Sequence, residues 1–178
     1  ISDPFRWLIF GKPKNGKTSF ILQFCKEISK FVKVYYNSME EGDSKTMQQA
    51  FINAQMHEVQ DGRFMLGDRD SFADMIEKLK KNHARVVVID SRDYMKLTTD
   101  QYKTLTRTFP RKSFIIICWE QSGKPLGKYA KDIEFMVDMV THVRNFEALT
   151  RGRFGIGKYK IWDRKTQAGE QATLNLTE

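Results

Sequence analysis

The chain has 178 residues, of which 40% are hydrophobic and 29% charged, and its formal net charge is +8. This length and balance are typical of one globular domain, expected over residues 1–178, and no apolar run reaches the roughly 18 residues that span a bilayer. A membrane protein is therefore not expected, while the positive charge suits a polyanionic partner such as nucleic acid.

Two cysteines, Cys25 and Cys118, lie far apart in apolar stretches. Their spacing matches neither a zinc site nor a redox pair. We interpret both as reduced core residues, which predicts a cytoplasmic protein because disulfides are rare in that compartment.

Strand and helix patterns alternate through the first two thirds of the chain. Short apolar runs predict buried strands, and apolar residues at helical spacing predict the helices between them. The expected strands are residues 6–10, 33–38, 63–66, 85–90 and 113–119, and the expected helices are residues 18–30, 46–56, 71–81 and 99–108.

The last third differs, because strand patterns outnumber helix patterns there. We expect a Gly/Lys/Pro loop at 121–129, a helix at 130–139, strands at 140–146, 159–163 and 172–176, a basic Gly-rich loop at 150–158 and a turn at 167–169. The sequence thus predicts an α/β fold: a mainly parallel central sheet, flanked by helices and extended by an antiparallel C-terminal edge.

The segment between the first strand and the first helix carries the clearest motif. Residues 11–18 fit the pattern G-x-x-x-x-G-K-[ST], a phosphate-binding loop when a strand precedes it and a helix follows. Backbone N–H groups of such a loop, with the positive end of the helix, hold phosphates. We predict that it binds a nucleoside triphosphate, with Lys17 on the β- and γ-phosphates and Thr18 on Mg²⁺. The predicted binding residues are Gly11, Lys12, Pro13, Lys14, Asn15, Gly16, Lys17, Thr18 and Ser19.

Acidic residues after two other strands complete the predicted site. Asp90 ends the buried strand of residues 85–90 and can reach Mg²⁺ directly or through water. Glu40 and Glu41 follow the second strand. Glu40 is our candidate for the base that activates water, and Glu41 is the alternative.

Four segments together resemble the RecA-like ATPases, especially the branch of the DnaB replicative helicases and RadA/KaiC-type proteins. They are the phosphate-binding loop, Ser38-Met39-Glu40, the strand that ends at Asp90, and residues 131–140. The resemblance covers most of the chain. It implies a RecA-like P-loop NTPase fold in which Glu40 is the catalytic base.

The family pattern has two further elements, a polar sensor and a Lys-x-Arg pair, and this sequence departs from it at both. A polar sensor is expected after the strand of residues 113–119, where Gln121 or Glu120 is the candidate. The family's late Lys-x-Arg pair, which reaches a neighbouring subunit's γ-phosphate, is replaced by Asp163-Arg164-Lys165. Arg164 or Lys165 is therefore expected to act in trans within a homo-oligomer.

By the same analogy, single-stranded DNA is expected to bind the loop after the strand of residues 113–119. Its lysines would contact phosphates and its aromatic ring would stack on a base. The expected contacts are Lys124, Lys128, Tyr129 and Lys131. A second basic cluster fits a nucleic-acid contact, a subunit contact or an exposed loop about equally, and consists of Arg151, Arg153, Phe154 and Lys158.

The function implied is Mg²⁺-dependent ATP hydrolysis coupled to DNA binding, as in a helicase, recombinase or repair-type motor. One alternative is a KaiC-like regulatory ATPase that acts on protein partners. Another is a nucleotide-binding assembly module with weak hydrolysis. A GTPase is disfavoured because the sequence has no Asn-Lys-x-Asp motif that would read guanine.

Overall fold

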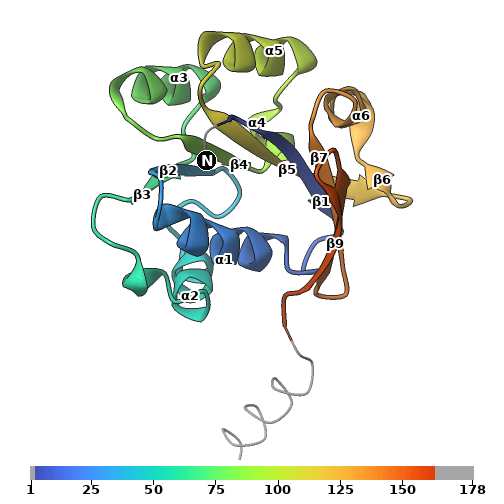
Figure 1. Cartoon of the computed structure of the whole chain (residues 1–178), viewed down its shortest axis with the longest axis horizontal. Coiled ribbons are helices and arrows are strands. Elements are labelled where there is room, and N and C mark those ends of the chain that lie inside the picture. Colours follow the sequence, from blue (N-terminus) through green and yellow to red (C-terminus); the bar gives the residue numbers. More distant parts are fainter. Residues whose placement is uncertain (1–2, 163–178) are drawn as a thin grey trace, which may run out of the picture.

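Short β-branched and aromatic runs form the centre of a nine-stranded sheet in the computed structural model, which describes residues 3–162 (Figure 1). The strands are β1 (Arg6–Gly11), β2 (Val34–Ser38), β3 (Phe64–Asp68), β4 (Val86–Asp90), β5 (Ser113–Gln121), β6 (Lys124–Pro125), β7 (Met139–Arg144), β8 (Glu147–Gly152) and β9 (Gly155–Lys160). The helices are α1 (Lys17–Ser29), α2 (Lys45–Asn53), the 3-10 helix η1 (Met56–Glu58), α3 (Phe72–Lys81), α4 (Arg92–Met95), α5 (Thr99–Thr108) and α6 (Gly127–Glu134).

The strands follow the order β3-β2-β4-β5-β1-β7-β8-β9, and β6 pairs with β5. Pairing is parallel from β3 to β7 and antiparallel for β5–β6, β7–β8 and β8–β9, so the sheet is mixed. The register sets Ser38 beside Asp90 and Gly11 beside Trp119. The carboxyl ends of β1, β2, β4 and β5 therefore meet at one edge.

Helices cover both faces of the parallel part of the sheet. Figure 1 shows α1 and α2 on one side, and α3 and α5 on the other. Alternate residues of β1 point to opposite faces: Trp7 and Ile9 pack with α1, whereas Leu8 and Phe10 pack on the side of α3, α5 and α6. Burial on both faces explains why these strands are almost continuously apolar.

The strands predicted in the first two thirds of the chain are confirmed to within a few residues. The expected loop at 121–129 is wrong, because β5 continues to Gln121, turns back into β6, and leads to α6 at Gly127. Gly123 and Gly127 have φ angles of 77° and 81°. These glycines make a tight turn and a helix start, where composition alone suggested an irregular loop.

The basic Gly-rich loop expected at 150–158 is also wrong, because β8 and β9 form a hairpin there. A Cβ on Gly152 would lie 2.3 Å from the carbonyl oxygen of Asp138, so this glycine allows the backbone of the hairpin to approach the segment just before β7 closely. The predicted strand at 172–176, the turn at 167–169, Arg164 and Lys165 lie outside the described residues. Within residues 3–162, none of the helices has the length and hydropathy of a membrane span.

Candidate ligand-binding cleft

A cleft of about 470 Å³ opens where the carboxyl ends of the central parallel strands meet. Crevices at this edge of an open α/β sheet are where such folds bind ligands. Eight predicted site residues, from three parts of the chain, come together here: Pro13, Lys14, Gly16, Lys17, Thr18, Ser19, Glu40 and Asp90. The other lining residues are Glu41, Thr46, Met47, Gln49, Ala50, Asn53, Trp119, Phe146 and Trp162.

The phosphate-binding loop has its shape because two positions have no side chain. A Cβ on Gly11 would lie 2.2 Å from the carbonyl oxygen of Val143, and one on Gly16 would lie 3.0 Å from Cδ1 of Phe146. Gly16 also has a φ of 96° and is the N-cap of α1, where it offers no side chain to the helix. The first N–H groups of α1 therefore keep the capacity to bind an anion.

Lys17 lies inside the curve of this loop. Its Nζ donates hydrogen bonds to the carbonyl oxygens of Gly11 (2.9 Å) and Lys12 (3.0 Å). Burial lowers the pKa of Lys17, while the negative charges of Asp90 and Glu40 act to raise it. The ammonium group is thus held where a bound phosphate would meet it.

Asp90 is buried at the end of β4 and is held by two hydroxyl groups. Thr18 Oγ1 donates to Asp90 Oδ2 at 3.2 Å, and the Tyr36 hydroxyl donates to the same oxygen. Burial raises the pKa of Asp90, although the hydrogen bond from Tyr36, the charge of Lys17 and the hydrogen bond from Thr18 oppose this rise.

The Thr18–Asp90 pair fits Mg²⁺, which takes one or two protein oxygens and completes its shell with phosphate oxygens and waters. In the part of the chain that the structure describes, no group of three or more His, Cys, Asp or Glu side chains could hold a metal by itself. Thr18 and Asp90 are therefore the residues that would hold the ion together with a ligand.

Glu40 lines the cleft with its side chain open to solvent, and its backbone N–H lies 3.4 Å from the carbonyl oxygen of Asp90. Burial raises its pKa, as do the charges of Asp90 and Glu41, whereas Lys17 and a hydrogen bond from Trp119 lower it. Glu41 also lines the cleft, but its Oε2 accepts a hydrogen bond from Ser44 Oγ (3.0 Å) at the start of α2. The contacts thus distinguish the two acids that the sequence left as alternatives.

An aromatic wall closes one side of the cleft, and sequence reasoning missed it. Phe146 and Trp162 lie with ring centroids 5.3 Å apart. Asn145 and Phe146 form the β7–β8 turn with φ angles of 51° and 59°, and the Asn145 N–H donates to Asn15 Oδ1 at 2.9 Å. The one sequence signal was Asn145, a residue type that tolerates this conformation.

The two sensor candidates do not line the cleft. Gln121 is exposed at the end of β5. Glu120 points toward β7, where its Oε2 lies 2.9 Å from Nε2 of His142 and its Oε1 accepts from the N–H of Gly123. Trp119 is the β5 residue that reaches the cleft.

The residues expected to contact DNA lie outside the cleft as well. Lys124 is on β6, and the others lie on α6 rather than on a loop. All four side chains are exposed: Lys124, Lys128, Tyr129 and Lys131.

Comparison with known proteins gives one family, and it is not the expected one. Residues 24–98 match the model of a family described as "Putative lumazine-binding". The matched segment covers less than half of the chain and begins after the phosphate-binding loop. The search of curated proteins finds no match.

The family match contradicts the resemblance inferred from the sequence, and we correct that inference accordingly. The RecA-like fold label and the functions that rested on it are withdrawn: ATP-driven work on DNA by a helicase, recombinase or repair-type motor, the KaiC-like regulatory role, and the assembly module with weak hydrolysis. The description of the matched family names a small ligand, lumazine. The geometry of the cleft does not depend on the family label.

Proposed function

We propose that the protein binds a small phosphorylated ligand, together with a divalent cation, in the cleft. The observation that carries this proposal is the contact between Thr18 and Asp90, 3.2 Å apart, at the start of a helix whose N-cap is a glycine. A cation at this pair would meet phosphates held by the loop N–H groups and by Lys17. ATP with Mg²⁺ is the ligand that we propose.

The aromatic wall supports a ligand with a flat heteroaromatic ring. Phe146 and Trp162 lie on the same cleft as Pro13 and Lys14 of the phosphate-binding loop. A ring bound against them would be joined to phosphates that reach Lys17 and Thr18. Stacking on aromatic side chains stabilises such rings with little dependence on their hydrogen-bonding edge.

Calorimetric titration with ATP tests the proposal. We expect binding in the presence of Mg²⁺, a strong loss of affinity in Lys17→Ala, and unchanged affinity in Lys103→Ala, which removes an equal charge from the exposed face of α5. Binding of ATP to Lys17→Ala with the parent's affinity would rule out this cleft as the phosphate site.

An ATPase activity at this cleft stays a prediction, and the position of Glu40 beside Asp90 and Lys17 supports it. Glu40→Gln should still bind ATP with Mg²⁺ and hydrolyse it about 10²–10⁴-fold more slowly, because a positioned base commonly contributes that much. Glu41→Gln is the matched control. If Glu41→Gln hydrolyses ATP slowly and Glu40→Gln does so at the parent's rate, Glu41 and not Glu40 is the base.

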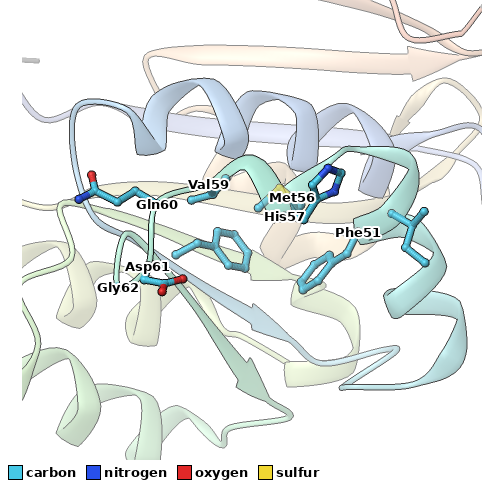
Figure 2. A pocket seen from close by; sticks show the side chains of 9 residues that line it. Phe51, Met56, His57, Val59, Gln60, Asp61 and Gly62 are labelled. Atoms are coloured by element: carbon cyan, nitrogen blue, oxygen red, sulfur yellow. The ribbon is translucent and has the colours of Figure 1, made fainter.

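A second candidate function is binding of a lumazine-type heterocycle in a separate pocket of about 380 Å³. The family match favours it, because residues 24–98 include the whole lining of this pocket. Figure 2 shows Phe51 and the segment of Gln60, Asp61 and Gly62 at opposite ends of it. Phe51 and Phe64 meet edge to face at 5.6 Å and would contact the ring, while Gln60 and Asp61 offer hydrogen-bonding groups to its edge.

Titration with lumazine itself, followed by the ligand's fluorescence, tests this second candidate. We expect Phe51→Ala and Asp61→Asn to weaken binding, and Lys17→Ala to leave it unchanged because Lys17 does not line this pocket. The opposite pattern would place the heterocycle in the cleft.

Three further expectations stay proposals. Cys25 and Cys118 are both free and buried, which supports a cytoplasmic location. A homo-oligomer is checked by light scattering with and without ATP. Single-stranded DNA remains the proposed nucleic-acid partner, on the strength of the net charge of +8.

A further inference from the structure

The β8–β9 hairpin carries a surface that neither the cleft nor the pocket of Figure 2 uses. Among residues 3–162, β9 is the last strand of the sheet, and all six of its residues are exposed. Ile156 on β9 is 92% exposed, and Phe154 at the hairpin turn is 75% exposed. Large apolar side chains this exposed at a sheet edge indicate a contact surface when they lie together.

Cations alternate with these apolar side chains on one face of the hairpin. The register sets Arg151 opposite Ile156 and Leu149 opposite Lys158. Side chains that face each other across paired strands lie on the same side of a sheet. Arg151, Lys158, Leu149 and Ile156 therefore share one face, with Phe154 at its end.

Each of the hairpin's paired cations is held by one acid and stays mostly open to solvent. Arg151 pairs with Glu134 (3.0 Å) and its side chain is 70% exposed. Arg153 with Asp138 and Lys158 with Glu147 are similar, at 3.3 and 3.0 Å. Exposed ion pairs contribute little to stability, so a phosphate can replace the acid at small cost.

We propose that this face and the turn at its end, formed by Leu149, Arg151, Arg153, Phe154, Ile156 and Lys158, bind single-stranded nucleic acid, an inference that rests on the nucleic-acid partner proposed above. The cations neutralise phosphates, and Phe154 stacks on a base. An open sheet face with alternating cations and apolar groups suits a flexible strand whose bases and phosphates alternate in the same way. The interleaved cations make it a poor surface for insertion into a membrane, and like charges oppose pairing of β9 with a second copy.

Fluorescence anisotropy with a labelled oligothymidylate tests the proposal. Arg151→Ala, Arg153→Ala and Lys158→Ala together should weaken binding and reduce the log–log salt slope by about 2, since each single-strand phosphate contact contributes roughly 0.7. Phe154→Ala should weaken binding about tenfold or more without changing the salt slope, because it removes stacking and no charge. Far-ultraviolet circular dichroism checks that both variants fold.

The matched control removes the same charge elsewhere, by Lys80→Ala, Lys81→Ala and Lys103→Ala on α3 and α5, and should bind like the parent. The proposal is overturned if the hairpin variant binds with the parent's affinity and slope. It is also overturned if Lys124→Ala, Lys128→Ala and Lys131→Ala abolish binding while the hairpin variant does not. The same holds if the parent binds no oligothymidylate at low salt, whether or not it binds anionic vesicles or self-associates through β9.

Discussion

Asp90 is the residue on which the contacts of the cleft converge. Tyr36 comes from the neighbouring strand β2, and Thr18 from the first turn of α1, and both donate to one carboxylate oxygen. Hydrogen bonds to a buried charged group are among the stronger ones in proteins, because leaving such a group unpaired is costly. The stability of the sheet edge and the readiness of the cation site therefore depend on the same atom.

Tyr36→Phe should lower the free energy of unfolding by about 1.5–3 kcal/mol, because it removes a hydrogen bond to a buried carboxylate. It should also weaken the binding of ATP with Mg²⁺, since Asp90 loses a partner that orients it. Urea denaturation and calorimetry measure the two effects.

Tyr35→Phe is the matched control, because the Tyr35 hydroxyl donates to Asp70, which also pairs with Lys78. Asp70 does not line the cleft, so this variant should keep the parent's affinity for ATP. Equal loss of affinity in both variants would contradict the role given to Tyr36.

Tryptophan fluorescence should report ligand binding, because two of the three tryptophans line the cleft. Trp119 reaches the cleft from β5, and Trp162 belongs to the aromatic wall. Trp7 is buried and does not line the cleft. Its indole N–H donates a hydrogen bond of 2.8 Å to Thr141 Oγ1.

The signal on titration with ATP and Mg²⁺ should therefore vanish in the double variant Trp119→Phe, Trp162→Phe. It should persist in Trp7→Phe. A signal that depended on Trp7 would show that the ligand acts on the core rather than in the cleft.

At the scale of elements, the strand–loop–helix unit of β1, residues 12–16 and α1 was predictable because its signals are local. Two glycines at fixed spacing and a following lysine are enough to specify the loop. The β8–β9 hairpin was not predictable for the opposite reason. Gly152 allows close packing against residue 138, and no pattern within the hairpin's own sequence indicates that contact.

Gly16→Ala should destabilise the unit and disturb the loop. A residue with a Cβ is strained at a φ of 96°, and the Cβ would also press on Phe146 at 3.0 Å. Gly123→Ala separates these effects, since Gly123 has a φ of 77° but nothing within 4 Å of the added carbon.

Gly123→Ala should cost about 1 kcal/mol, the price of the backbone conformation alone. Gly16→Ala should cost more and should also weaken ATP binding, measured by thermal denaturation and calorimetry. If both variants lose the same stability, Phe146 is not a rigid wall beside the loop.

At the scale of the whole molecule, the sequence predicted which segments form the central parallel strands but not how they assemble the cleft. Continuous β-branched runs such as residues 86–89 specify burial on both faces, and the strand ends then carry Asp90 and Ser38 to one edge. The aromatic wall depends on a contact between Asn15 and Asn145, 130 residues apart in the chain. No local pattern could reveal that contact.

The family resemblance failed for a related reason. A phosphate-binding loop and an acid after a buried strand are local units that many unrelated functions share. They describe a binding site, and they carried the inference of a whole family only by analogy. The match over residues 24–98 lies outside that loop and is to the model of a different family.

Ligand binding should be visible as a gain in the stability of the whole molecule. A ligand that binds only the folded state stabilises it by RT ln(1 + [L]/Kd), which is about 2.7 kcal/mol at a hundredfold excess over Kd. For a domain of this size, that corresponds to a rise in Tm of about 5–10 °C.

We expect this rise with ATP and Mg²⁺, a smaller one when EDTA removes the metal that Thr18 and Asp90 would hold, and none in Lys17→Ala. Lumazine without metal should raise the Tm of the parent and of Lys17→Ala alike if it occupies the pocket beside Phe51. An equal response of Lys17→Ala and the parent to ATP with Mg²⁺ would show that the cleft does not bind the triphosphate.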